Sequence, residues 1–206
     1  MLRILSRDSF KALASQGRKM NKMFVFDLDG VLVDACDWHK HALNEALKEV
    51  CNYEISQEDH IKTFNGLPTK VKLEMLSENN ILDRRMHSDV YNIKQQKTVD
   101  IIKKQASYDH EKVELINFLK KEGFVVCCFT NSIRKTAELM LEKAGILDLF
   151  DSVITNQDVK SPKPNPEGYL YLMNKFKVSK DMCYIVEDSP KSLKAAIDSG
   201  ANIIAV

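Results

Sequence analysis

The sequence lacks long apolar runs and lacks an excess of charge of either sign. Its 206 residues carry 30 Lys and Arg against 29 Asp and Glu, which gives a formal net charge of +1. A protein that binds nucleic acid or an acidic membrane surface usually presents a field of one sign. No apolar stretch approaches the roughly 20 residues that a membrane-spanning helix needs. We therefore expect no nucleic-acid partner and no membrane partner.

Cysteine is also scarce, and its pattern argues against a disulfide framework and a thiolate metal site. The five cysteines are odd in number, and Cys36, Cys51 and Cys183 lack the spacing of metal ligands. Cys127 and Cys128 are adjacent in an apolar run, so in a strand they would point to opposite faces. We expect free, buried thiols in a reducing compartment. The sequence also lacks internal repeats and low-complexity tracts.

The first 22 residues differ from the rest, because they are basic, contain serine and are only weakly amphipathic. Such a segment could be an organellar transit peptide. Asp8 argues against that interpretation, and Met20 and Met23 offer alternative starts. We interpret residues 1–22 as an N-terminal leader that is disordered or packed on the fold. The expected location is cytoplasmic, with an organellar leader as the alternative.

The most informative stretch of the chain is an apolar run that leads into two carboxylates. Residues 24–26 are Phe, Val and Phe, Asp27 follows directly, and Asp29 and Gly30 come shortly after. A short apolar run that ends in a turn is typical of a buried parallel strand, and open α/β sheets bind ligands at the carboxyl ends of such strands. Two close carboxylates repel each other unless a cation lies beside them. One carboxylate can then act as a nucleophile and the other as an acid or base. The plain alternative is a strand that ends in an acidic turn.

Three further polar segments follow in order. The apolar run 125–129 ends in Thr130, Asn131 and Ser132, and the apolar run 183–186 ends in Glu187 and Asp188. Between them, the proline-rich loop 161–166 presents a single lysine, Lys163. The set supplies carboxylates for a metal, hydroxyl and amide groups for phosphoryl oxygens, and a fixed positive charge. Phosphoryl transfer needs these parts.

The periodicity divides the chain into a core and an insertion. Helices are expected at 37–50, from Ser56 to Phe64, from Pro68 through Leu76 and at 89–105, with no confident strand between them. Strands are expected at 124–129, 152–155, 182–186 and 202–206, separated by helices. We predict an α/β fold with a doubly wound, Rossmann-like parallel sheet. Residues 23–36 and 106–206 would form this core, and residues 37–105 an inserted all-helical cap domain.

The four motifs, in this order, resemble those of the haloacid dehalogenase superfamily. The resemblance covers roughly residues 23–206 and favours the branch with a helical cap, the subfamily IA, β-phosphoglucomutase-like phosphatases and phosphomutases. It implies that Asp27 attacks phosphorus to form an aspartyl-phosphate, and that Asp29 acts as acid and base. It further implies that Thr130 and Asn131 hold the phosphoryl oxygens, and that Lys163 neutralises developing charge.

The resemblance also implies a Mg²⁺ cofactor and a set of substrate contacts. The metal ligands would be Asp27, Asp29 through its backbone carbonyl, and Asp188, with Glu187 close by. The residues expected to bind phosphate or substrate are Gly30, Asn131, His39, Gly66 and Lys94. His39 would link the cap to Asp29; the alternative is a histidine that packs on Trp38 or faces solvent.

We therefore expect a Mg²⁺-dependent phosphatase that acts on a small phosphorylated metabolite, possibly a sugar phosphate. The first alternative is a phosphomutase of the β-phosphoglucomutase type. It is disfavoured because the neutral Thr69 stands where a mutase would carry an arginine. The second alternative, of another class, is a non-catalytic binding or regulatory protein with the same fold. We expect a monomer or weak dimer.

Overall fold

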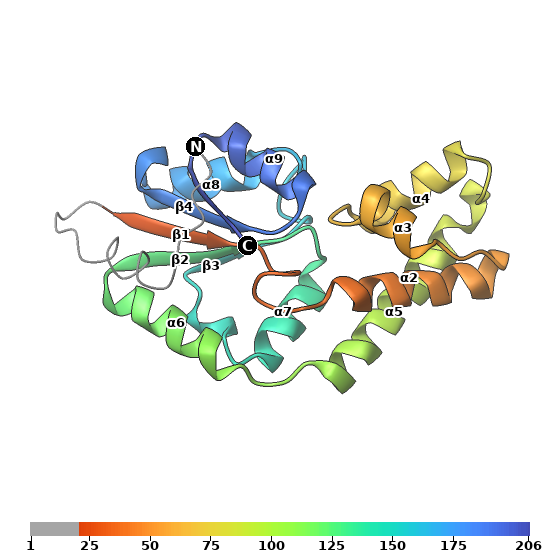
Figure 1. Cartoon of the computed structure of the whole chain (residues 1–206), viewed down its shortest axis with the longest axis horizontal. Helices are drawn as coiled ribbons and strands as arrows, with labels where there is room; N and C mark the ends of the chain where they lie inside the picture. The colour runs from red at the N-terminus through yellow and green to blue at the C-terminus, as the bar shows by residue number, and fades with distance from the viewer. Residues whose placement is uncertain (1–20) are drawn as a thin grey trace.

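The protein is built on a five-stranded sheet in which every strand pair is parallel (Figure 1). The computed structural model describes residues 21–206, so most of the expected leader lies outside the described residues. The strands are β1 (Lys22–Phe26), β2 (Phe124–Phe129), β3 (Ser152–Ile154), β4 (Cys183–Glu187) and β5 (Asn202–Ala205), in the order β3-β2-β1-β4-β5. The predicted fold class is confirmed, and each expected strand lies within a residue or two of its predicted bounds. β1 begins at Lys22, one residue inside the expected leader.

Helices cover both faces of the sheet (Figure 1). One face carries α6 (His110–Lys121) and α7 (Arg134–Lys143), and the other carries α8 (Glu167–Phe176) and α9 (Pro190–Ser199). Side chains alternate between the faces, as the pleat of a strand requires. Cys128 therefore packs with α6 and α7, whereas Cys127 packs with α8. Both thiols are buried and free, as the sequence predicted.

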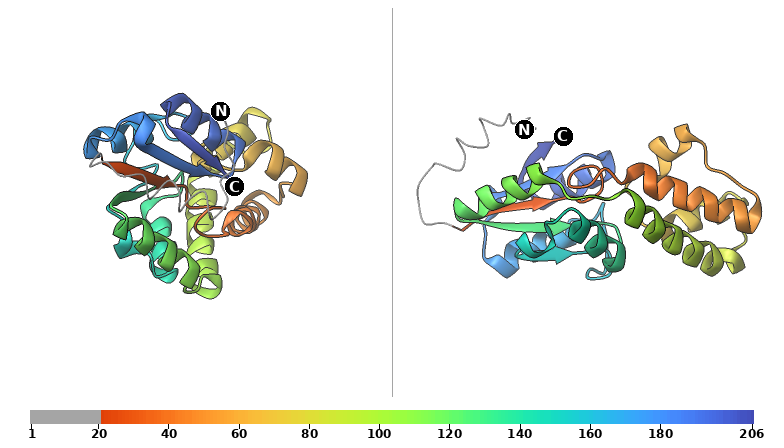
Figure 2. Two further views of the ribbon diagram at one scale, coloured as in Figure 1. Left: turned by 60° about the vertical axis from the view of Figure 1, so that its left-hand side comes forward. Right: turned by 90° about the horizontal axis from the view of Figure 1, so that it is seen from below.

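A helical segment is inserted between β1 and α6. It contains α2 (Cys36–Cys51), α3 (Gln57–Asp59), the π-helical turn η1 (His60–Phe64), α4 (Thr69–Glu78), the 3₁₀ turn η2 (Arg84–Met86) and α5 (His87–Gln105). The long helices α2 and α5 pack side by side (Figure 2). The segment has its own apolar cluster, built from Leu43, Ala46, Leu47, Ile55, Phe64, Leu73, Leu76, Leu82 and Val90. The exact domain boundaries, 23–36 with 106–206 and 37–105, stay a prediction.

The helix expected from Ser56 to Phe64 is interrupted. Ser56 caps its start, since its side chain accepts a hydrogen bond from the Asp59 N–H at 3.0 Å. After Asp59 the chain widens into the π turn, and the Asn65 N–H donates to the His60 carbonyl at 2.8 Å. Two short 3₁₀ turns, η3 (Leu147–Leu149) and η4 (Lys180–Met182), complete the described elements of the core.

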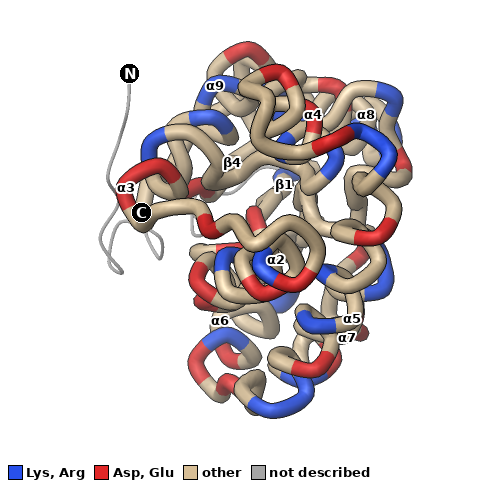
Figure 3. The backbone as a smooth tube through the Cα atoms, turned by 90° about the vertical axis from the view of Figure 1, so that its right-hand side faces the viewer, with Lys and Arg blue, Asp and Glu red and all other residues tan. Residues whose placement is uncertain are grey.

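The order of the strands determines where a ligand can bind. β1 is central, with β2 on one side and β4 on the other, so the chain reverses its direction of winding beside β1. Ligands of open α/β sheets bind at such a switch point, beyond the carboxyl ends of the strands. Positive and negative residues are interspersed over the end of the molecule that carries the inserted helices (Figure 3). Within residues 21–206, no helix is long and apolar enough to cross a membrane.

Candidate active site

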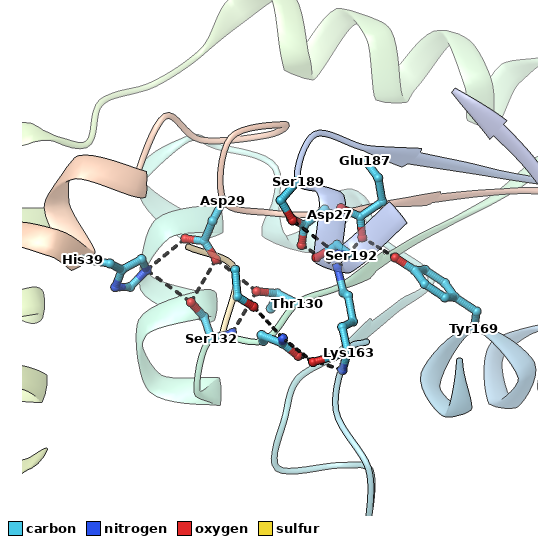
Figure 4. A network of polar contacts seen from close by, with 12 residues as sticks. Asp27, Asp29, His39, Thr130, Ser132, Lys163, Tyr169, Glu187, Ser189 and Ser192 are labelled. Atoms are coloured by element: carbon cyan, nitrogen blue, oxygen red, sulfur yellow. Dashed lines mark hydrogen bonds and ion pairs between the residues drawn. The ribbon is translucent and has the colours of Figure 1, made fainter. Parts of the chain in front are cut away.

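The carboxyl ends of β1 and β4 bring two acidic residues onto one buried lysine. Lys163 Nζ donates to Asp27 Oδ1 at 2.7 Å and to Glu187 Oε1 at 2.6 Å (Figure 4). The ammonium also lies over the ring of Phe129, 5.0 Å from its centroid. Tyr169, on α8, donates from its hydroxyl to the same Glu187 oxygen. Lys163 is only 1% exposed, so its charge is compensated by side chains and not by water.

The charges of this cluster shift the pKa values of its members in opposite directions. Burial, followed by the charge of Glu187, raises the pKa of Asp27 well above its ordinary value, and Lys163 only partly opposes this. Burial alone would lower the pKa of Lys163, but the charges of Asp27 and Glu187 raise it instead. Lys163 stays charged when either carboxylate is ionised, because both lie within hydrogen-bond distance. Two carboxylates share one lysine, and the raised pKa of Asp27 reflects the cost of ionising both, a cost that a bound cation would lower.

A potential cation site lies beside Asp27. Within residues 21–206, ligand oxygens of Asp27, Glu187 and Asp188 all lie within 4.8 Å of one another. Glu187 Oε2 and Asp188 Oδ1 are buried and have no hydrogen-bond partner. Buried carboxylate oxygens without donors are costly unless a cation coordinates them. These residues therefore fit the hard divalent metal that the sequence predicted.

Gly30 supports this acidic cluster from behind. Its φ of +92° favours glycine, and a Cβ atom at this position would collide with Asp188 Oδ2. Its N–H donates to the Val33 carbonyl at 2.8 Å and is not available to a phosphate. Gly30 also does not line the cavity that Asp27 and Asp29 face. The turn folds back on itself, and Gly30 makes room for Asp188; its expected contact with phosphate or substrate stays a prediction.

Asp29 occupies a different environment from Asp27. Its Oδ1 lies 2.9 Å from His39 Nε2, and its Oδ2 accepts from Ser132 Oγ at 2.9 Å and from Thr130 Oγ1 at 3.1 Å (Figure 4). Burial would raise the pKa of Asp29, but the charge of His39 and the hydrogen bonds from His39, Ser132 and Thr130 lower it to about 2. Asp29 is therefore ionised in the free protein at neutral pH.

His39 reaches Asp29 from helix α2 and is itself held by Lys94 from helix α5. Lys94 Nζ lies 3.1 Å from His39 Nδ1. Burial, then the charge of Lys94, lowers the pKa of His39, so its ring is neutral at neutral pH. The ionised Asp29 can only accept a hydrogen bond, so Nε2 must carry the hydrogen and Nδ1 accepts from Lys94. At neutral pH the uncharged His39 acts on Asp29 as a hydrogen-bond donor, and once His39 is protonated its charge also stabilises the Asp29 carboxylate.

Asn131 ties the inserted helices to the loop that carries Lys163. Its Nδ2 donates to the Gly66 carbonyl at 2.8 Å and to the Lys163 carbonyl at 2.9 Å, while its Oδ1 accepts from the Lys163 N–H at 3.0 Å. Gly66 has a φ of +74° and lies close to Ser189 of the core. A second link is the hydrogen bond from Lys191, on α9, to the Thr63 carbonyl. The helical segment is thus seated over the carboxyl ends of the strands.

A cavity of about 330 Å³ separates the inserted helices from the sheet. Its core side includes Asp27, Asp29 and Asp188, and its helical side includes His39, Lys72 and Lys94. Most of the predicted site residues therefore come together around one space. Lys163, Thr130 and Glu187 lie just beneath it, through their contacts with the two aspartates.

The structure also adds residues to the site that the sequence did not single out. Ser132 was visible only as the end of the motif that begins at Thr130, and the structure places its hydroxyl on Asp29. Tyr169 is fully buried and contacts Glu187, but its spacing on α8 resembles that of an ordinary core residue. Lys72 lies in a lysine-rich turn of α4, a pattern typical of a solvent-exposed helix face. In the structure, however, Lys72 is only 6% exposed.

A family model described as haloacid dehalogenase-like hydrolase matches residues 24–206. The match spans most of the chain, and the protein belongs to this family. Pyrophosphatase PpaX from Bacillus velezensis is 25% identical over 191 residues, which cover 88% of this chain and 81% of that protein. Phosphoglycolate phosphatase from Nitrosospira multiformis is 28% identical over 194 residues, with 90% and 82% covered. Fructose-1-phosphate phosphatase YqaB from Escherichia coli is 25% identical over 185 residues, with 88% and 94% covered.

Solved structures show the same fold. CbbY from Rhodobacter sphaeroides, in complex with xylulose-(1,5)bisphosphate, matches with a TM-score of 0.80 at 19% identity, over 90% of this chain and 86% of that one. β-Phosphoglucomutase from Clostridium difficile matches with a TM-score of 0.77 at 20% identity, over 91% of each chain. The predicted subfamily IA fold is thus confirmed. The protein is a phosphatase of this family that acts on small phosphorylated metabolites.

Proposed function

We propose that the protein is a Mg²⁺-dependent phosphomonoester hydrolase that works through an aspartyl-phosphate on Asp27. The observation that carries the proposal is the contrast between two carboxylates on one strand end. Asp27 is bound by Lys163 and belongs to the acidic cluster, whereas Asp29 is bound by three neutral donors and faces the cavity. One carboxylate is arranged for attack and the other for proton transfer.

In the first step, Asp27 attacks phosphorus and the bond from phosphorus to the ester oxygen breaks. The electron pair leaves with the ester oxygen, which takes a proton from Asp29. In the second step, a water molecule gives a proton to Asp29 and attacks the aspartyl-phosphate. Inorganic phosphate leaves and Asp27 is restored. Lys163 stays in contact with Asp27 and offsets charge during both steps.

Asp29 must gain a proton before the first step, because its pKa in the free protein is about 2. The arrival of a phosphate dianion in the cavity supplies a reason, since a nearby like charge raises the pKa of a carboxylate. His39 and Ser132 hold the carboxylate toward the cavity while this occurs. Binding and protonation of Asp29 are thereby linked.

The residues that would hold Mg²⁺ are Asp27 and Asp188, together with the Asp29 backbone carbonyl, and Glu187 lies beside them. When bound, the metal supplies positive charge that reduces the repulsion between the nucleophile and the phosphate. The relatives named as phosphoglycolate and fructose-1-phosphate phosphatases support a small substrate, and a sugar phosphate remains within the proposal.

Phosphomutase activity is the second candidate, because three lysines of the inserted helices, Lys70, Lys72 and Lys94, line the cavity despite the neutral Thr69. The test is a panel of phosphate monoesters incubated with the full-length protein and Mg²⁺. Release of inorganic phosphate supports the hydrolase, whereas formation of glucose 6-phosphate from glucose 1-phosphate without release supports the mutase. Inactivity with every ester would favour the non-catalytic alternative.

A further inference from the structure

Within residues 21–206, three lysines are nine-tenths or more buried, and they differ in what surrounds them. Lys163 is 1% exposed and is bound by two carboxylates. Lys94 is 6% exposed and contacts the His39 ring. Lys72 is also 6% exposed, yet no hydrogen bond or ion pair joins it to any residue in the described range 21–206. Lys72 is therefore a buried cation without a partner.

Lys72 lines the cavity that holds the catalytic carboxylates. It projects from α4, while Lys94 reaches the same cavity from α5. Burial, and after it the nearby charge of Lys72, lowers the pKa of Lys94 from 10.5 to about 7, so the two lysine side chains lie close together. The helical wall thus places two buried basic side chains, each cationic when protonated, opposite Asp27 and Asp29.

His60 adds unsatisfied hydrogen-bonding groups to the same wall. Both of its ring nitrogens are buried without a partner, and it lines the cavity. Its side chain is 4% exposed. A neutral imidazole always carries one N–H, so His60 can donate to a group placed in the cavity. This wall therefore has two independent groups without a partner among the described residues, the Lys72 ammonium and the His60 imidazole. Both can donate a hydrogen bond to an acceptor in the cavity.

The missing group must be an anion. An unpaired buried charge is unfavourable, and a second positive charge nearby makes it more so. Asp29 does not form an ion pair with Lys72, and its two oxygens already accept hydrogen bonds from His39, Thr130 and Ser132. In the proposed mechanism the transferred phosphate lies at Asp27, which belongs to the core side of the cavity, whereas Lys72 belongs to the helical side. A different anionic group is needed at Lys72.

We propose that Lys72 and Lys94, with His60 beside them, bind a second anionic group of the substrate. The preferred substrates are then small phosphate monoesters that carry a carboxylate or a second phosphate a few bonds from the scissile phosphate. This inference rests on the proposed hydrolase function, because it assumes that the first phosphate lies at Asp27. The roughly 330 Å³ of the cavity fit a compact molecule with an anion at each end.

The experiment compares matched pairs of substrates with the full-length protein and Mg²⁺. One pair is 2-phosphoglycolate and 2-hydroxyethyl phosphate, which differ by the carboxylate. The other is fructose 1,6-bisphosphate and fructose 1-phosphate, which differ by the second phosphate. The readout is kcat/KM from released phosphate, expressed as the ratio within each pair. Comparing the two ratios distinguishes a carboxylate from a phosphate as the second anion.

Wild type should prefer the substrate with the second anion by about tenfold to a hundredfold in at least one pair, the range expected for a charge-assisted contact. Lys72→Met should lower that ratio by about tenfold or more, mainly through KM, and Lys72→Arg should restore most of it. Lys48→Met is the matched control, because Lys48 is an exposed lysine of the same helical segment that does not line the cavity. It should leave the ratio unchanged.

Three outcomes would overturn the inference while leaving the hydrolase in place. Wild type could show no preference in either pair. Lys72→Met could lower both members of a pair equally, which would indicate a structural role. Lys72→Arg could fail to restore the ratio although the variant is folded by circular dichroism. If Lys72→Met does not fold, the inference is tested by the wild-type ratios and by the ratio measured with Lys72→Arg. Absence of phosphate release from every ester would instead overturn the proposed function itself.

Discussion

The strand ends and the inserted helices each bury a lysine, and they treat its charge differently. At the strand ends, Lys163 contacts Asp27 and Glu187, so the positive charge is compensated within the protein. In the inserted helices, Lys72 has no such partner among the described residues. The first arrangement stabilises a site before any ligand arrives. The second leaves an electrostatic cost that a ligand can relieve, and we propose that it marks the part of the site that selects the substrate.

The comparison also explains why the acidic side needs a cation and the helical side an anion. On the core side, Asp27, Glu187 and Asp188 cluster near the single Lys163, whereas the helical side places Lys72 and Lys94 beside two histidines. Each side carries an excess of one sign, although the whole chain is close to neutral at +1. A metal ion and a doubly anionic substrate would together neutralise both excesses.

The strongest test of the strand-end site removes the proposed nucleophile. Asp27→Asn should lower kcat for phosphate release by at least about a thousandfold, because an amide cannot form the aspartyl-phosphate. The fold should survive, since Lys163 keeps Glu187 as a partner. Asp34→Asn, at an exposed position of the same loop, is the control and should retain activity. Wild-type turnover in Asp27→Asn would exclude Asp27 as the nucleophile.

Loss of the paired lysine should be the largest effect on stability. Lys163→Met leaves Asp27 and Glu187 buried without their cation, and breaking a buried ion pair from one side costs about 3 kcal/mol or more. We expect this decrease in the free energy of unfolding by urea denaturation in buffer that contains EDTA. Lys175→Met, on the exposed side of α8, should change it little. Equal stability of Lys163→Met and wild type would show that the ion pairs of Lys163 make no net contribution to the free energy of unfolding.

The acidic excess is tested through the metal requirement. Asp188→Ala removes one anionic oxygen ligand, so the Mg²⁺ concentration for half-maximal phosphate release should rise by about tenfold or more. Asp34→Asn again provides the control, because it removes a nearby acidic charge outside the cluster. A Mg²⁺ requirement that does not change in Asp188→Ala would place the metal elsewhere.

The strand-end site could be predicted because its residues follow directly from local sequence. Asp27 and Glu187 each come at the end of an apolar strand, and parallel strands in one sheet bring such ends together. Lys163 was recognisable because prolines fix the loop on both sides of it. For Gly30 the sequence indicated a turn, but it did not indicate that the turn would place Gly30 against Asp188.

The helical side could not be predicted to the same degree. Lys70 and Lys72 are two residues apart on α4, and in the sequence both resemble solvent-facing lysines. In the structure α4 contacts α5, and Lys72 is buried whereas Lys70 stays exposed. Lys94 was expected to hold a remote phosphate, but its contact with His39 also connects it to Asp29. Tertiary packing of helices, unlike strand ends, leaves no short signature in the chain.

The smallest expected effect is the pH dependence of the stability change at Lys72, and it distinguishes Lys72 from Lys163 most clearly. Burial lowers the pKa of Lys72 from 10.5 to about 8; among its charged neighbours, Asp29 and Cys36 oppose this shift and Lys191 reinforces it. Below pH 8, Lys72 is protonated in both the folded and the unfolded chain, so the fold carries the whole cost of the buried charge. Between about pH 8 and 10.5 the folded chain loses this proton first, and the fold becomes more stable as pH rises.

Lys72→Met should therefore stabilise the protein at pH 7, by about 1–3 kcal/mol, since each pKa unit corresponds to about 1.4 kcal/mol. The gain should shrink as pH rises from 8 toward 10.5, the pKa range of the folded and unfolded lysine. Urea denaturation of both proteins across this range measures it, with Lys48→Met as a control that should show no such trend. Lys163→Met should change stability in the opposite direction at pH 7. A destabilised Lys72→Met with no pH trend would mean that Lys72 has a compensating partner, and the contrast between the two buried lysines would disappear.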